Sequence, residues 1–278
     1  MKKRKSIKQT YQESKRSSLV VYTVLRVLVI VCMILQILKG NFENALLCLL
    51  SLLLLLVPFF IQKNFKITLP NTLEIIILLF IFSAEILGEI QNFYGIFPFW
   101  DTMLHTINGF LAAAVGFSLI NLLNKNSEKF NLSPVYLCLV AFCFSMTIGV
   151  LWEFFEFASD KVLSIDMQKD RVVDKISSVE LDPEKNNNPI VIKDIGYTII
   201  YNNEGKELAK ISNGYLDIGI NDTMKDLIVN FIGAVVFSSL GYFYLISKGK
   251  NTFVTNFVPQ KGSRKVFPKT LKTYPKEK

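Results

Sequence analysis

The stretch Asp101-Thr-Met-Leu-His105-Thr-Ile-Asn108-Gly109-Phe-Leu-Ala-Ala-Ala-Val-Gly116 decides the fold, because it places ionisable side chains at the start of an apolar helix. His105 is the only histidine in the chain. An ionisable group in the hydrocarbon region is costly and usually faces a bundle interior, a partner or a water-filled cavity. The stretch therefore predicts a membrane helix whose polar side chains serve an internal site.

Five further stretches have a similar apolar character, and each is long enough to cross a bilayer. A crossing takes about 20 residues at a rise of about 1.5 Å per residue. Apolar residues make up 51% of the 278-residue chain, a high share for a soluble protein. The sequence predicts an all-α integral membrane protein, a bundle of six transmembrane helices. The expected spans are Leu19–Leu38, Ala45–Ile61, Thr72–Ile90, Thr102–Leu123, Val135–Ala158 and Thr223–Ile246.

Lysine and arginine gather at the two ends of the chain. The formal net charge is +8, and we assign most of it to basic tails at 1–18 and 247–278. Cytoplasmic segments carry an excess of these residues, so both termini are expected in the cytoplasm of a bacterium, with a multi-pass chain in its cytoplasmic membrane. The first span resembles a signal peptide in its basic flank, but it is too long and lacks a small-residue cleavage site, which indicates a retained anchor.

The same distribution of charge bears on partners. Basic tails are attracted to anionic headgroups, so membrane lipids are the expected partners. The sequence contains no motif that indicates nucleic-acid binding, and it specifies no oligomeric state.

A polar segment, 159–221, separates helices one to five (19–158) from the sixth helix (222–246). It is too long for a plain connection. Strand-like Tyr197–Tyr201, the turn residues Asn202-Asn203-Glu204-Gly205 and Leu208–Ile211 predict a small β-hairpin on the extracytoplasmic face. The first half, through 182–188, is expected to be flexible.

Four of the predicted spans carry polar residues at one level beneath the outer surface. The third and fifth spans run outward and carry these residues in their last turns, whereas the fourth and sixth run inward and carry them in their first turns. Within each helix the spacing is three or four residues, which projects them from one side. The set consists of Glu85, Asp101, His105, Asn108, Glu153, Glu156, Asp222, Asp226 and Asn230.

Crowded carboxylates cannot all stay ionised without compensating positive charge. Lys225 is the only basic residue near this set in the sequence, so we expect shared protons, a divalent metal ion or a cationic ligand. Carboxylates with an imidazole suit Zn, Mn or Fe, and oxygen ligands alone suit Mg or Ca. The candidate metal ligands are His105, Asp101, Glu153, Glu156, Asp222 and Asp226. The candidate catalytic groups are Glu153, Glu156 and Asp226, with Glu85, Asn108 and Asn230 in support.

Simpler roles exist for individual members. Asp101 and Asp222 stand at helix starts, where aspartate commonly caps the helix. His105 alone would be typical of a hydrogen-bonded packing residue. Three functions stay open: metal-dependent hydrolysis or transfer on a lipid-linked or cell-envelope substrate, a proton- or cation-coupled transporter, and a non-catalytic membrane scaffold. The lack of a clear repeat and of a Gly/Pro-broken helix pair counts against the transporter.

Three short motifs resemble the YjdF-like family, bacterial membrane proteins of unknown function. They are Asp101–Phe110, Trp152-Glu153-Phe-Phe-Glu156, and Asp222-Thr-Met-Lys-Asp226 with Gly233-Ala234 after it. The Asp-x-x-x-His at a helix start is also loosely similar to VanZ-like membrane proteins, which are associated with glycopeptide resistance. The resemblance covers about Glu85 to Gly241. It implies that the motif residues belong together, and it implies no reaction.

Overall fold

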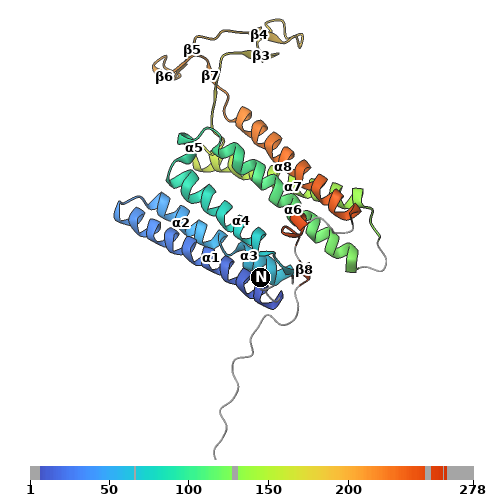
Figure 1. The fold of residues 1–278 in the computed structure, drawn as a ribbon. Coiled ribbons are helices and arrows are strands. Elements are labelled where there is room, and N and C mark those ends of the chain that lie inside the picture. Colours follow the sequence, from blue (N-terminus) through green and yellow to red (C-terminus); the bar gives the residue numbers. More distant parts are fainter. Residues whose placement is uncertain (1–6, 66, 127–130, 248–251, 259, 262–278) are drawn as a thin grey trace, which may run out of the picture.

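The structure, a computed structural model, describes residues 7–65, 67–126, 131–247, 252–258 and 260–261. Long helices lie side by side, and small strands project from one end of the bundle (Figure 1). We call this end, where α6 and α8 begin, the strand end. The helix α3 and the strand β8 lie at the opposite end (Figure 1).

The first part of the bundle consists of α1 (Ile7–Leu38), α2 (Phe42–Leu54), α3 (Val57–Phe65) and α4 (Asn71–Phe82). Asn41 begins α2, because its side chain accepts a hydrogen bond from the Asn44 main-chain N–H at 3.1 Å. The shared core of α1, α2 and α4 is apolar. Its buried members include Leu25, Val29, Cys48, Leu55, Leu78 and Ile81.

The helix α4 continues directly into a π-helical segment, η1 (Ser83–Ile90), and a short helix, α5 (Phe93–Ile96), follows. The Gln91 N–H donates to the Ile86 carbonyl at 3.0 Å, which is the five-residue spacing of a π-helix. Such segments are rare and often lie at functional sites. Here η1 carries Glu85, which is buried.

The second part consists of α6 (Trp100–Asn126), α7 (Pro134–Leu163) and α8 (Ile220–Ile246), each of which packs on the other two. A Cβ atom on Gly109 would lie 2.0 Å from the main-chain oxygen of Asn230, and one on Gly233 would lie 2.1 Å from that of Thr106. The backbones of α6 and α8 are therefore in direct contact, which residues without a side chain permit.

Aromatic side chains fill the space between α6 and α8 further from the strand end. The rings of Phe110 and Phe237 are 5.0 Å apart, and Phe257 lies 5.2 Å from Phe110. Phe257 follows the short helix α9 (Thr252–Thr255) and is buried with Val254. Residues 252–258 of the basic tail expected from residue 247 are therefore packed, because their apolar side chains complete the core.

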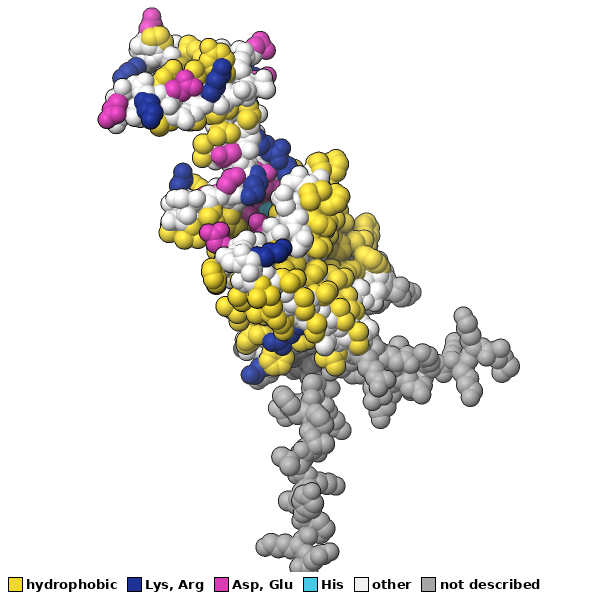
Figure 2. All heavy atoms as spheres, turned by 90° about the vertical axis from the view of Figure 1, so that its left-hand side faces the viewer, with side chains coloured by type: hydrophobic (Ala, Val, Ile, Leu, Met, Phe, Trp, Pro, Cys, Tyr) yellow, Lys and Arg dark blue, Asp and Glu magenta, His cyan; other side chains and the backbone are white. Residues whose placement is uncertain are grey.

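Within the described residues, five helices are long and apolar enough to cross a membrane. They are Ser17–Leu38, Phe42–Asn64, Trp100–Asn124, Pro134–Leu163 and Ile220–Ile246. The span Phe42–Asn64 comprises α2 and most of α3. The third predicted span, 72–90, is divided between α4 and η1, neither of which has the required length by itself. The mostly helical membrane fold is confirmed, and the sixth crossing stays a prediction. Figure 2 shows hydrophobic side chains over the bundle and charged side chains toward the strand end.

Between α7 and α8 lie six short strands that pair antiparallel as β2–β7, β3–β4 and β5–β6, with Val172 opposite Leu216 and Tyr197 opposite Ser212. Their bounds are β2 (Val172–Val173), β3 (Ile176–Ser178), β4 (Ile190–Ile192), β5 (Tyr197–Tyr201), β6 (Glu207–Ser212) and β7 (Tyr215–Leu216). The pair β5–β6 lies in the segment for which the sequence predicts a hairpin. At the opposite end β1 (Ile67–Thr68) pairs with β8 (Gln260–Lys261).

The first half of the connection between α7 and α8, expected to be flexible, forms β2, β3 and a hydrogen-bonded turn. The Asp182 carboxylate accepts main-chain N–H groups of Asn188, Glu184 and Asn186. These hydrogen bonds, that of Asn188 foremost, lower the pKa of Asp182. A carboxylate can organise a turn because it accepts several N–H groups at once. The low hydrophobicity of 182–188 did not indicate this.

Candidate functional site

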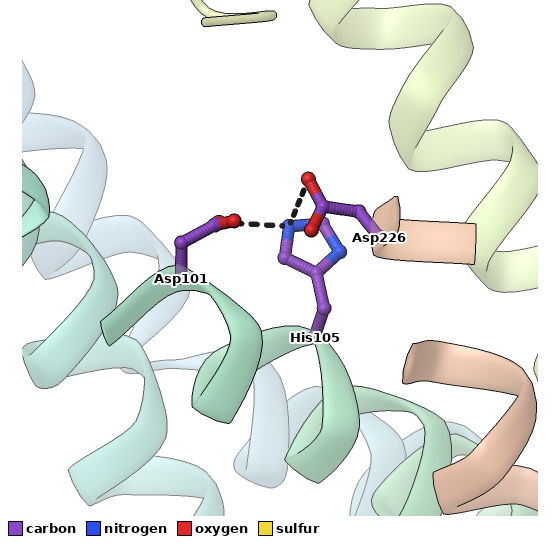
Figure 3. A group of neighbouring side chains, drawn as sticks. All are labelled: Asp101, His105 and Asp226. Atoms are coloured by element: carbon purple, nitrogen blue, oxygen red, sulfur yellow. Dashed lines mark ion pairs between the residues drawn. The ribbon is translucent and has the colours of Figure 1, made fainter. Parts of the chain in front are cut away.

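Three of the predicted site residues come together at the strand end: Asp101 and His105 of α6, and Asp226 of α8 (Figure 3). One ligand atom from each lies within 4.8 Å of the other two. His105 Nε2 is 3.4 Å from Asp101 Oδ1 and 3.9 Å from Asp226 Oδ2. The arrangement offers one imidazole nitrogen and two carboxylate oxygens to a common position.

The backbone explains why these side chains meet. Asp101 and His105 are four residues apart, so they project from one side of α6. The close contact of Gly109 with Asn230 fixes α8 against that side, and Asp226 lies one turn before Asn230. The site is thus built on two helices in backbone contact, which holds side chains more precisely than loops do.

The helix α7 contributes two buried glutamates. Glu153 Oε1 lies 3.9 Å from His105 Nδ1, on the other ring nitrogen from the two aspartates. Glu153 Oε2 is buried and has no hydrogen-bond partner among the described residues. Glu156 accepts a hydrogen bond from the Trp152 indole N–H at 2.8 Å. A buried carboxylate oxygen without a partner is costly and calls for an explanation.

Lys225 lies beside the three-residue group. Its Nζ atom is 2.7 Å from Asp101 Oδ2 and 3.4 Å from Asp226 Oδ1. Each aspartate therefore directs one oxygen to His105 and the other to Lys225. The Lys225 side chain is 28% exposed and that of Asp226 is 2% exposed, so the ammonium lies nearer the surface than the group it neutralises.

Asp222 binds different partners. Arg171 Nη2 is 3.1 Å from Asp222 Oδ1, Lys225 Nζ is 3.7 Å from the same oxygen, and the Lys169 main-chain N–H donates to Oδ2 at 3.2 Å. Asp222 does not cap α8, which begins at Ile220 after Gly219. Asp101 likewise lies inside α6, after Trp100. The capping alternative for these two aspartates is wrong, because both lie inside their helices. Their carboxylates pair with cations instead.

Arg171 comes from the strap, our name for residues 166–171, which joins α7 to β2. The Gln168 side-chain amide donates to the Thr223 hydroxyl at 2.6 Å, and Asp160 accepts the main-chain N–H groups of Met167 and Gln168. The strap passes so close to Gly219 that a Cβ there would lie 2.6 Å from the Gln168 Cβ. At a φ of +81°, Gly219 also adopts a backbone conformation that suits glycine.

The strap corrects one expectation from the sequence. Lys225 is the only basic residue near the acids in the sequence, and further compensation was expected from protons, a metal ion or a cationic ligand, but Arg171 also belongs to the site. It lies 51 residues from Asp222 in the chain, and no local pattern connects the two. The prediction from the sequence therefore did not include Gln168 and Arg171 among the site residues.

The supporting residues differ in their placement. The Asn108 amide donates to Asn230 Oδ1 at 3.1 Å, and the Ser145 hydroxyl donates to the Gly109 carbonyl at 2.7 Å. Asn230 is almost fully buried, one turn deeper than Asp226. Glu85 lies in η1, and the described contacts do not join it to His105. The structure thus places two of the three supporting residues directly beneath the site.

Tyr94 of α5 is a further neighbour of the acids. Its ring packs on Gly88, where a Cβ would lie 2.4 Å from Cε2. Burial, followed by the negative charges of Glu89, Asp101, Glu85 and Glu156, raises the pKa of Tyr94. The sequence did not identify Tyr94 as a neighbour of the site, because a tyrosine near a membrane surface is expected in any case.

The sequence profile of a family described as "Predicted membrane protein (DUF2238)" matches residues 20–247. The chain belongs to this family. The YjdF-like resemblance is thereby confirmed, since both names denote one family. An uncharacterized protein of Thermotoga maritima is 29% identical over 106 residues, which cover 38% of this chain and 53% of that relative. The match thus spans about half the relative's length. No solved structure matches the chain.

Proposed function

We propose that this protein binds a divalent metal ion at the strand end and catalyses hydrolysis or transfer on a lipid-linked or cell-envelope substrate. The observation that carries the proposal is the group of Asp101, His105 and Asp226, whose ligand atoms lie within 4.8 Å of one another. Two carboxylates and an imidazole suit Zn, Mn or Fe.

The charges around the group support a cation. Lys225 and Arg171 provide two formal positive charges against five carboxylates. These belong to Asp101, Glu153, Glu156, Asp222 and Asp226. Glu153 Oε2, which has no hydrogen-bond partner among the described residues, belongs to a carboxylate on the Nδ1 side of His105, opposite the two aspartates. A proton on Glu153 would supply the missing interaction there, and a cation would compensate the two aspartates, since buried carboxylates need protons or positive partners.

Each residue then has a chemical role. Asp101, His105 and Asp226 would hold a divalent ion, and the chemistry such an ion would supply is a more acidic water. Glu153 would serve as the acid–base group that takes up a proton and returns it to the leaving group. Glu156, oriented by Trp152, completes the acid–base pair. Asn108 and Asn230 hold the two helices in register beneath these groups.

The membrane position of the site indicates the substrate. We assign the strand end to the extracytoplasmic face, with both termini cytoplasmic and α4 with η1 as the sixth crossing, in keeping with the basic ends of the chain. His105 then lies roughly 7.5 Å below the start of α6, near the depth of lipid headgroups. A headgroup or a lipid-linked group would reach it without leaving the membrane.

Packing below the site favours an enzyme over a transporter. The described core beneath Asn230 is aromatic, with Phe237 and Phe117 fully buried between α6 and α8. Phe257 closes the same space from the carboxyl-terminal side. A carrier needs polar groups along its path, and this stretch of the described structure provides an apolar barrier.

Metal analysis of the purified full-length protein tests the proposal. We expect one bound Mn²⁺ or Zn²⁺ per chain in the wild type, and an affinity at least about 100-fold lower in His105→Ala and Asp226→Asn. Glu43→Gln, which changes an exposed acid of α2, is the control and should bind as the wild type does. A wild-type protein without stoichiometric metal would exclude the metal-dependent function.

A further inference from the structure

Around Asp222, three hydrogen-bond donors with positive character converge on one carboxylate. The Arg171 guanidinium and the Lys225 ammonium both lie within 4 Å of Oδ1, and the Lys169 main-chain N–H binds Oδ2. They come from two distant segments, the strap and the first turns of α8. The carboxylate they surround is 5% exposed.

We propose that these donors form an anion subsite for a phosphate group of the substrate, which Asp222 fills in its absence. The proposal rests on the proposed function, because it names the substrate class of the same site. Guanidinium groups bind phosphate through paired N–H donors, and lysine contributes a compact charge. The positive end of the 27-residue helix α8 adds to the attraction.

The position of the subsite fits a reacting group. Lys225 Nζ contacts Asp222 and also Asp101 and Asp226, so one ammonium joins the subsite to the candidate metal ligands. A phosphate in place of the Asp222 carboxylate would therefore lie next to the metal position. Its oxygens can engage Arg171, Lys225 and the Lys169 N–H while one of them faces the site.

The subsite is also accessible. The Arg171 side chain is 48% exposed and that of Lys225 is 28% exposed, whereas Asp226 and Glu153 are buried. The two cations are thus open to an anion arriving from the strand end. Asp222 can leave the donors without unwinding α8, because the helix begins at Ile220 and does not use Asp222 as its cap.

Phosphate binding by the full-length protein in detergent tests the subsite, with inorganic phosphate as the probe in isothermal titration. Asp222→Ala vacates the donors, so we expect it to bind phosphate about tenfold or more tightly than the wild type. A second change, Arg171→Met, should abolish the gain. Asp174→Ala, which removes an exposed acid from the same connection, is the control for a general change in charge.

Asp222→Asn keeps the shape of the side chain, so it carries the test if the alanine variant does not fold. A gain no larger than that of Asp174→Ala in both variants would overturn the subsite. The titration is performed without metal and again with Mn²⁺. A phosphate gain without metal supports the subsite even if the wild type binds no Mn²⁺, which would overturn the proposed function alone.

The source of the phosphate group is tested in vesicles of phosphatidylcholine that contain either phosphatidic acid or diacylglycerol. Displacement of inorganic phosphate from Asp222→Ala by phosphatidic acid, and not by diacylglycerol, supports a lipid headgroup in the subsite. Undiminished binding of inorganic phosphate in both vesicles supports a soluble phosphate compound. Loss of phosphate binding in both kinds of vesicle overturns the subsite in the membrane.

Discussion

The three helices α1, α2 and α4 and the three helices α6, α7 and α8 are all rich in apolar residues but pack differently. In the first unit, as we name α1, α2 and α4, side chains such as Val29 and Leu78 separate the helices. In the second unit, formed by α6, α7 and α8, Gly109 and Gly233 bring α6 and α8 into backbone contact. The clustered acids and His105 lie in the second unit.

The difference teaches how a membrane protein holds charges inside a bundle. Lipid tails are as apolar as leucine, so close packing and polar contacts drive helices together instead of burial from water. Backbone contact also shortens the distance between side chains one turn away, which brings Asp226 to 3.9 Å from His105. Among the described residues, no glycine of α1, α2 or α4 makes such a contact, and the first unit serves as an apolar support.

The largest expected effect on stability comes from changing the glycines of the backbone contact between α6 and α8. Gly109→Ala and Gly233→Ala should each destabilise the protein by about 3 kcal/mol, because the new methyl group would overlap a main-chain oxygen. Thermal unfolding in detergent, followed by tryptophan fluorescence, measures this. Gly196→Ala is the control, since a Cβ there meets no atom within 4 Å. Wild-type stability of both variants would break the distinction between the units.

A smaller effect on stability is expected when Lys225 loses its charge. Lys225→Met should lower the metal-free stability by about 2 kcal/mol, because three aspartates lose a common partner. Added Mn²⁺ should restore it by supplying the charge. Lys63→Met in α3 changes an exposed lysine that lies over the Phe59 ring and should have little effect. Equal stability of the two variants in chelator would contradict the prediction.

The join between the units gives a third prediction. The Trp100 indole N–H donates to the Ser83 carbonyl at 3.3 Å, which connects α6 to η1. Trp100→Phe should cost at least about 1 kcal/mol in thermal stability, since an aromatic ring is kept while the hydrogen bond and part of the indole packing are lost. The exposed Phe99 provides a control through Phe99→Leu. A larger loss in the control would show that the aromatic surface, and not this hydrogen bond, joins the units.

The smallest effect concerns the strap and its dependence on pH. Desolvation favours neutral Asp217, but hydrogen bonds from the Arg171 N–H, the Asn221 amide groups and the Gly219 N–H outweigh it and lower the pKa of Asp217. A lowered pKa in the folded state stabilises the strap at pH values above the unfolded pKa. That stabilisation is lost as the pH falls through the folded value.

Pepsin cleavage within 164–219, followed between about pH 5 and pH 2, measures this loss. Asp217→Asn should remove the acid dependence that comes from this residue, because its side chain does not titrate. Asp194→Asn, on the connection between β4 and β5, should cleave with the wild-type pH profile. An unchanged profile in Asp217→Asn would exclude Asp217 as the origin.

Much of the fold follows from local features of the sequence. Long apolar runs give helices, and the spacing of Asp101 and His105 fixes them on one face of α6. Glu153 and Glu156 are likewise placed together by a single helix. The interruption of the third span was not predictable from hydropathy, since α-helical and π-helical segments contain the same apolar residues.

By itself, the sequence determined that helices cross an apolar region and that acids and a histidine gather at one end. It also identified the family through its motifs. Tertiary structure alone decided that Asp226 and not Asp222 approaches His105, and that Arg171 returns from the strap. The physical reason is that helical periodicity fixes the direction of a side chain, whereas distances between helices depend on the contact of Gly109 and Gly233 and on the path of a long connection.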